Sequence, residues 1–226
     1  MLSALRRLPG QCAVCHAWPA QPVCEACVAR FAQPVPRCRT CATPVPAGVA
    51  QCGACLREPP PLDACLAAVH YAYPWAELIA RFKFRQQPGW AHSLALLLRG
   101  ADGVDEALAR CDWLLPLPLS GQRLRERGFN QTLELARRLA PEKTAAHLLL
   151  RLRDTPAQSA LPLAERLRNV RGAFAVDPLH AARLRGKHVL LLDDVMTSGA
   201  TLHAAAHALR EAGATQITGL VLARTE

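Results

Sequence analysis

The chain has 226 residues and a formal net charge of +9 at pH 7, and 51% of its residues are hydrophobic. This length exceeds one small module and leaves room for a sizeable core, while no apolar run approaches the length of a membrane span. The positive charge favours acidic partners, phosphorylated metabolites or nucleic acid alike.

Eight of the ten cysteines form four C-x-x-C pairs, all before residue 60. Two such pairs supply four thiolates for one tetrahedral ion, so the four pairs predict two closed structural zinc sites with no open catalytic position. Sequential pairing is the simplest arrangement, although the spacing also permits crossed pairings. In the sequential arrangement, one Zn²⁺ is held by Cys12, Cys15, Cys24 and Cys27, and the other by Cys38, Cys41, Cys52 and Cys55.

A disulfide framework in a secreted protein is the alternative use of such cysteines. The first ten residues argue against export, because Arg6 and Arg7 interrupt the apolar residues and no small-residue cleavage site is evident. We therefore expect a cytoplasmic protein in which zinc holds together a segment too poor in large apolar residues to fold on its own core. A redox role is a minor alternative for the pairs. Cys65 and Cys111 lie outside the pattern and are expected to be buried.

The proline cluster at 59–61 marks the predicted boundary between a double zinc-ribbon domain, 1–60, and a larger domain, 61–226. Beyond it strands and helices alternate, which predicts an α/β fold with a parallel sheet and helices on both faces. The predicted strands are Cys65–His70, Trp113–Pro118, His147–Leu152, one beginning at Val189, and Ile217–Leu222. The predicted helices are Trp75–Phe84, Trp90–Ala109, Phe129–Ala140, Leu163–Val170 and one that follows the Val189 strand.

The segment Val189–Leu202, VLLLDDVMTSGATL, carries the strongest functional signal. Its first four residues are apolar at consecutive positions, as in a central parallel strand covered on both faces. Asp193 and Asp194 follow at the predicted carboxyl end, where open parallel sheets bind ligands. A turn of small and hydroxyl-bearing residues, suited to wrapping a phosphate at a helix N-terminus, comes next. This turn comprises Thr197, Ser198, Gly199, Ala200 and Thr201.

The helix after this turn has a regular apolar face and a glycine, Gly213, where a C-terminal cap belongs. Its apolar face consists of Leu202, Ala205, Ala206 and Leu209. An ordinary buried strand, turn and helix, with acids that are solvated or cap the helix, is the alternative interpretation. A Walker phosphate loop is excluded, because no lysine lies in the turn.

Paired acids followed by two threonines, a serine and a glycine closely resemble the phosphoribosyl-diphosphate (PRPP) signature of type I phosphoribosyltransferases. The resemblance implies that fold, with Asp193 and Asp194 as the catalytic pair that accepts hydrogen bonds from the ribose 2- and 3-hydroxyls. It also implies that the turn 197–201 holds the 5-phosphate of PRPP, and that Mg²⁺ binds together with PRPP.

The segment Leu115–Gln131, LPLPLSGQRLRERGFNQ, follows the Trp113 strand and is rich in arginine. Small residues permit close approach of the backbone, and guanidinium groups make bidentate contacts to phosphate oxygens. Because the matching loop of the type I fold holds the diphosphate, the resemblance implies this role here. A solvated basic helix face is the alternative. The predicted diphosphate-binding residues are Ser120, Gly121, Arg123 and Arg127.

The segment Arg153–Phe174 lies between two predicted strands, where type I transferases place a mobile loop that closes over PRPP. We interpret it as a lid, whose closure would exclude water and bring positive charge to the departing diphosphate. A basic surface helix is the alternative. The predicted lid residues are Gln158, Arg166, Arg168 and Asn169.

Nearly the whole chain resembles the ComF family of competence-type phosphoribosyltransferase-like proteins. The resemblance rests on the four cysteine pairs, RFKFR at Arg81–Arg85, RERGFNQ at Arg125–Gln131, the Arg153–Phe174 segment and the Asp193 segment. It implies PRPP binding and a role in competence, DNA uptake or DNA utilisation, with single-stranded DNA and competence proteins as partners. As an enzyme, the protein would transfer phosphoribose to a nitrogen acceptor.

A binding protein that senses PRPP or a nucleotide, or that contacts single-stranded DNA with little catalysis, is the competing hypothesis. The basic charge permits such a protein. Aromatic residues make up only 5% of the chain and do not interleave with the arginines, so DNA binding would rest on phosphate contacts and depend strongly on salt. The acceptor and the oligomeric state do not follow from the sequence.

Overall fold

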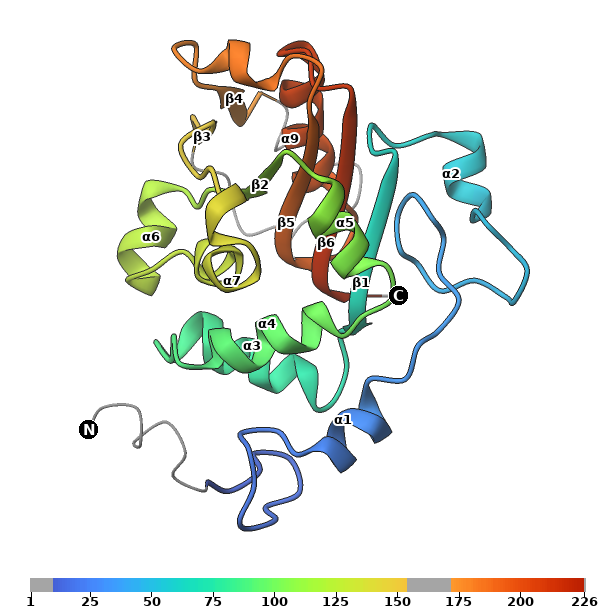
Figure 1. The fold of residues 1–226 in the computed structure, drawn as a ribbon, viewed down its shortest axis with the longest axis vertical. Helices are drawn as coiled ribbons and strands as arrows, with labels where there is room; N and C mark the ends of the chain where they lie inside the picture. Colours follow the sequence, from blue (N-terminus) through green and yellow to red (C-terminus); the bar gives the residue numbers. More distant parts are fainter. Residues whose placement is uncertain (1–9, 154–171, 226) are drawn as a thin grey trace.

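The computed structural model describes residues 10–153 and 172–225. Its centre is a four-stranded parallel sheet in the order β1-β6-β5-β2, with a separate antiparallel pair, β3 and β4, beside α9 (Figure 1). The strands of the sheet are β1 (Ala64–His70), β2 (Trp113–Pro116), β5 (His188–Met196) and β6 (Gln216–Arg224). The antiparallel pair consists of β3 (Leu149–Arg151) and β4 (Phe174–Val176).

Helices cover both faces of the sheet, as the alternating pattern predicts. On one face, Leu190 and Leu192 of β5 pack into a core with α3 (Trp75–Phe84), α4 (Trp90–Arg99), α5 (Val104–Arg110) and α7 (Gln131–Leu139). On the other face, Val189 and Leu191 pack against α9 (Ala200–Glu211) and the β3–β4 pair. All four β5 residues are fully buried, which confirms the predicted central strand.

Helix α9 has the apolar face and the end that the sequence predicts. Its four predicted core residues are buried. Gly213 adopts a left-handed φ of +93° and donates its N–H to the Arg210 carbonyl at 2.9 Å, while Ala214 donates to the Leu209 carbonyl at 3.0 Å. These two bonds form a Schellman motif, which satisfies the last carbonyls of the helix.

The helical layer differs from the prediction in two places. The helix predicted over Trp90–Ala109 is two helices, α4 and α5, because the chain turns between them and Gly103 takes a left-handed φ of +77°. The arginine-rich loop after β2 contains a short helix, α6 (Gly121–Arg127), which is capped by Ser120 and ends at Gly128, also left-handed. The helix predicted at 163–170 lies outside the described residues.

Two predicted strands also differ in their extent or partners. The strand predicted at 147–152 pairs with β4 in an antiparallel ladder and does not join the main sheet. Strand β5 continues beyond its apolar run to Met196, because Val195 and Met196 still pair with β6. Asp193 and Asp194 therefore lie within the strand and not after its end.

The cysteine-rich segment packs against both layers of the larger fold. Its helices are α1 (Glu25–Phe31) and α2 (Gly53–Arg57). Phe31 packs against the α3–α7 core, and its carbonyl accepts a hydrogen bond from the Trp75 indole at 2.7 Å. Cys38 and Cys55 belong to the core on the α9 side. The domain division at residue 60 remains a prediction.

The remaining described helices are the two short 3-10 segments, Pro141–Lys143 and Ala181–Leu184. Within residues 10–153 and 172–225, no helix combines the length and the apolar character that a membrane crossing requires.

The cap of α7 provides a test of the fold next to the sheet. The Asn130 side chain accepts hydrogen bonds from the N–H groups of Thr132 (3.0 Å) and Leu133 (3.3 Å) and donates to the Leu117 carbonyl (3.1 Å). We expect Asn130→Ala to lower the free energy of unfolding by about 1–2 kcal/mol, measured by urea denaturation. Asn130→Asp keeps the cap acceptor and should cost less; equal costs for the two variants would contradict a capping role.

Candidate functional site

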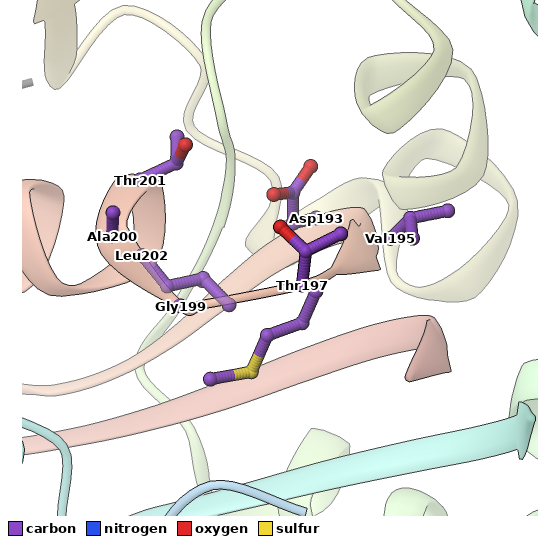
Figure 2. Close-up of a pocket in the computed structure, with 8 residues that line it drawn as sticks. Asp193, Val195, Thr197, Gly199, Ala200, Thr201 and Leu202 are labelled. Carbon is purple, nitrogen blue, oxygen red and sulfur yellow. The ribbon is translucent and has the colours of Figure 1, made fainter. Parts of the chain in front are cut away.

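A small pocket lies where β5 leads into α9, at the carboxyl end of the central parallel strand (Figure 2). Its volume is about 30 Å³, far below the roughly 300–1,000 Å³ of pockets that enclose whole ligands. The pocket therefore offers a niche for one ligand group. It is lined by Asp193, Val195, Met196, Thr197, Gly199, Ala200, Thr201 and Leu202.

Most of the predicted phosphate turn lines this pocket. Gly199 has a left-handed φ of +80°, and a Cβ there would lie 2.5 Å from the Met196 Cε and 2.8 Å from the His203 Nε2. Any other residue would therefore strain the backbone and displace the ends of these two side chains. The Ser198 hydroxyl accepts a hydrogen bond from the Ala200 N–H at 3.4 Å. Because α9 begins at Ala200, its first N–H groups and its positive dipole end lie at the pocket.

Asp193 is the single ionisable residue among those that line the pocket. Its carboxylate lies on the same side as the Thr197 and Thr201 side chains (Figure 2). One of its oxygens accepts a hydrogen bond from the Asp194 N–H at 2.8 Å. Burial and the negative charge of Asp194 raise the pKa of Asp193 to about 7. The site thus holds a carboxylate at an energetic cost.

Asp194 lies on the opposite face of β5, because consecutive strand residues point to opposite sides. It is 4% exposed, and its Oδ1 forms an ion pair with the Lys83 Nζ at 2.8 Å. Burial acts to raise the pKa of Asp194, but the Lys83 ammonium outweighs burial and holds this pKa below its ordinary value. The structure therefore places Asp193 in the pocket and Asp194 beside Lys83 at the end of α3.

The sequence marks Lys83 as a possible contact for a charged ligand but does not predict that its partner is Asp194. The RFKFR motif marks it as a basic residue between two phenylalanines, a pattern that amphipathic packing also explains. In the structure the side chains of Lys83 and Asp194 are only 13% and 5% exposed. A buried pair of this kind needs both members, because either charge alone would be desolvated without compensation.

The predicted diphosphate-binding residues all lie at or within α6. Ser120 is buried and caps the helix by accepting a bond from the Arg123 N–H at 3.4 Å. The Arg127 guanidinium lies 5.0 Å from the centre of the Phe84 ring. Burial lowers the pKa of Arg127, while the charges of Asp194 and Asp193 act to raise it, so this arginine belongs to the electrostatic surroundings of the acidic pair.

None of the four predicted diphosphate-binding residues is among those that line the small pocket. Gly121 is exposed and Arg123 is partly exposed. The predicted lid residues at positions 158, 166, 168 and 169 lie outside the described residues. Their role and the diphosphate role remain predictions.

The eight paired cysteines form two groups in sequential order, and each group could hold a metal ion. Within each group all sulfur atoms lie within 4.8 Å of one another. The Sγ–Sγ distances are 3.9 Å for Cys12–Cys27, 3.6 Å for Cys15–Cys24 and 3.7 Å for Cys41–Cys52. A tetrahedral ion with metal–sulfur bonds of about 2.3 Å requires sulfur atoms about 3.8 Å apart, so the donor sets fit zinc.

Comparison with a protein-family model supports this fold. Residues 134–225 match the phosphoribosyl transferase domain family. Two solved structures are similar at low identity. An allosteric regulatory enzyme of purine biosynthesis is 21% identical, with a TM-score of 0.38, over 59% of this chain and 25% of that chain. The Bacillus subtilis glutamine PRPP amidotransferase is 19% identical, with a TM-score of 0.36, over 60% of this chain and 26% of that chain. The family match and the parallel sheet together define the chain as a phosphoribosyltransferase-fold protein, and it also carries two four-cysteine groups.

Three similar proteins identify a particular family within this fold class. The DNA utilization protein YhgH of Salmonella typhimurium is 30% identical over 96% of this chain and 98% of its own length. Competence protein F of Haemophilus influenzae is 30% identical over 89% of this chain and 90% of its own length. Competence protein ComFC of Bacillus subtilis is 37% identical over half of this chain and 44% of its own length. The chain belongs to the ComF family.

The buried ion pair gives a first prediction for the site. Lys83→Met leaves the Asp194 carboxylate buried without its cation and should lower the free energy of unfolding by about 3 kcal/mol, measured by urea denaturation. Adding Asp194→Asn should recover most of this loss. Arg99→Met, which breaks an exposed pair with Asp105, should cost less than about 1 kcal/mol. If the losses of unfolding free energy caused by Lys83→Met and by Asp194→Asn simply add in the double variant, the pairing is contradicted.

The raised pKa of Asp193 gives a second prediction. In the folded protein the Asp193 carboxyl keeps its proton up to about pH 7, whereas an unperturbed carboxyl loses its proton near pH 3.8. Asp193 therefore makes the folded protein less stable as the pH rises from 3.8 to about 7. Asp193→Asn does not titrate, and its stability relative to the parent should rise from pH 4 to 7 and then level off. The expected gain is about 1.4 kcal/mol per unit of pKa difference. Parallel thermal-unfolding profiles for the two proteins would contradict the assignment.

Proposed function

We propose that this protein binds PRPP together with Mg²⁺ at the carboxyl end of β5 and that it acts in DNA uptake or DNA utilisation. One observation carries the proposal: Asp193 and the Thr197–Thr201 turn face one pocket at the N-terminus of α9. A carboxylate suits sugar hydroxyls, and N–H groups and hydroxyls at a helix N-terminus suit a phosphate. PRPP carries both groups a short distance apart.

The residues take distinct roles in this proposal. Asp193 accepts hydrogen bonds from the ribose hydroxyls, and the turn holds the 5-phosphate. Asp194, held by Lys83, raises the pKa of Asp193 and shapes the ribose site from the other face of β5. Its direct contact with the ribose would require the Lys83 pair to open. Arg127, with Arg123, Ser120 and the Gly121 backbone, supplies the diphosphate site beyond the pocket.

Phosphoribosyl transfer is the reaction that this arrangement suits. A nitrogen nucleophile forms a bond to C1 of the ribose while the bond from C1 to the diphosphate oxygen breaks, and the diphosphate leaves with the electron pair. The protein fixes the ribose and surrounds the departing charge with arginine. The Asp193 carboxylate is an oxygen donor of the kind that could hold Mg²⁺, which would help to neutralise charge on the diphosphate.

A binding protein without catalysis is the second candidate, and one observation favours it. Among the described residues that line the pocket, Asp193 is the single group able to accept a proton from an acceptor amine. Its proposed task is to hold the ribose. A PRPP-sensing protein that contacts single-stranded DNA through its basic surface would need no such base, and the net charge of +9 supports that contact.

The cysteine groups and the relatives complete the proposal. We propose that both groups bind Zn²⁺ as closed structural sites, because their sulfur spacings suit a tetrahedral ion. None of the ten cysteines forms a disulfide, which suits a reducing cytoplasm. The names of the relatives, DNA utilization protein and competence protein, support single-stranded DNA and competence proteins as partners.

Calorimetric titration of the zinc-loaded protein with PRPP and Mg²⁺ tests the proposal. We expect saturable binding, weakened at least tenfold by Asp193→Asn, because hydrogen bonds to a charged acceptor contribute about 1.5–3 kcal/mol. Glu77→Gln removes the same charge from an exposed site on α3 and should leave the affinity unchanged. Absence of binding to the parent protein would refute the proposal.

A diphosphate-release assay with nucleobases and amines then separates the two candidates. Release that depends on the acceptor establishes a transferase. Binding without release for any acceptor favours the sensing protein.

A further inference from the structure

Arg224, the last residue of β6, joins the phosphate turn to the second cysteine group. Its side chain is buried, at 8% exposure for the residue. Toward the turn, Nη1 donates to the carbonyls of Met196 (3.1 Å) and Thr197 (2.6 Å). Toward the cysteine group, Nε donates to the Cys41 carbonyl (2.9 Å) and Nη2 to the Thr43 hydroxyl (2.8 Å). One rigid guanidinium plane thus spans both segments.

A buried guanidinium normally pairs with a carboxylate, because an isolated buried charge is costly. The hydrogen bonds of Arg224 within residues 10–153 and 172–225 instead go to neutral carbonyl and hydroxyl oxygens. Its charge is therefore not balanced by an acid at bonding distance in that part of the chain. Each acceptor that moves away leaves a donor unsatisfied, so the two segments cannot shift independently.

The second cysteine group supplies the missing negative charge when it holds its metal. Zn²⁺ with four thiolates carries two net negative charges, and Cys41, whose carbonyl binds Arg224, is one of the four ligands. A second arginine, Arg37, donates to the carbonyl of Ala42 at 3.0 Å. Ala42 holds a left-handed φ of +56° directly after Cys41. Arg224 and Arg37 therefore both hold the backbone at Cys41 and Ala42 by hydrogen bonds. A metal ion bound by the second cysteine group would balance the charge of the two arginines.

The turn is equally dependent on its neighbours. Met196 contacts the buried Cys65 thiol, with sulfur atoms 3.7 Å apart, and its Cε lies against Gly199 of the turn. Arg224 holds the carbonyls of Met196 and Thr197 at the point where β5 ends and the turn begins. A displaced guanidinium would free both carbonyls and alter the direction of the following N–H groups.

We propose that Arg224 is a positioning residue that couples metal occupancy at Cys38, Cys41, Cys52 and Cys55 to the geometry of the phosphate-binding turn. Loss of metal from this group makes the backbone from Cys41 to Thr43 more mobile and breaks its hydrogen bonds with Arg224. The displaced Arg224 then weakens binding of the 5-phosphate of PRPP. The effect on PRPP rests on the function proposed above, whereas the effect on the turn itself does not. Coupling of this kind is a free energy shared by two sites and is measurable from either of them.

A double-variant cycle tests the coupling. Cys52→Ser removes one metal ligand, and Arg224→Lys keeps the charge but cannot span both segments. We expect each single variant to weaken PRPP binding about tenfold in calorimetry, within the usual range of coupling energies. The double variant should be no weaker than either single variant, because both changes break the same link. Independent, multiplying losses would overturn the proposal.

A matched substitution separates this role from a general loss of stability. Arg210 also donates to backbone carbonyls, including that of Thr215 at 2.7 Å, but at the opposite end of α9. Arg210→Lys should leave the PRPP affinity within about twofold of the parent. If Arg224→Lys does not fold, Thr43→Val removes a single bond of Arg224 and should weaken PRPP binding about threefold with both zinc ions retained. Unchanged affinity in the folded variant would overturn the proposal.

Hydrogen exchange of the 196–201 amides gives a readout that needs no ligand. Cys52→Ser and Arg224→Lys should each raise exchange there at least tenfold, and the double variant should exchange no faster. If the parent protein does not bind PRPP, the proposed function fails, and this experiment still decides the coupling. Protection of the turn that is unchanged in both single variants would overturn it.

Discussion

The arrangement of this protein depends on a central strand that packs against helices on both faces. Because consecutive side chains of such a strand point into different layers, two neighbouring carboxylates cannot share one environment. Asp193 faces the pocket, where burial and the charge of Asp194 raise the pKa of Asp193. Asp194 faces α3, where Lys83 lowers the pKa of Asp194. The charged pair on one face and the ligand niche on the other are consequences of the same strand.

The features that the sequence predicts are those with a short-range pattern. The apolar run before Asp193, the spacing of the cysteines and the apolar face of α9 each follow from residues close together in the chain. Their geometry confirms the central strand, the sequential cysteine groups and the helix that begins at the pocket. The turn is predictable for the same reason, because a glycine in the sequence marks the position that adopts a left-handed φ.

Contacts between residues that are far apart in the sequence do not follow from short-range patterns. Lys83 and Asp194 meet because α3 packs across the face of β5, and Arg224 meets Cys41 because β6 ends beside the second cysteine group. Each is a charged residue whose partner is set by tertiary packing and leaves no local signature. The break between α4 and α5 differs in kind, since Gly103 signals it locally, but the apolar period continues across the break and favours one helix.

The two cysteine groups are best understood as parts of the frame around the site. The first group packs through Phe31 against the helical layer that carries Lys83, and the second contributes Cys38 and Cys55 to the core on the α9 side. A metal site usually stabilises the segment that supplies its ligands. Here the same ions would also fix the surfaces on which the two faces of β5 rest. With metal bound, the two cysteine groups would thus support both faces of β5, although no cysteine lines the pocket itself.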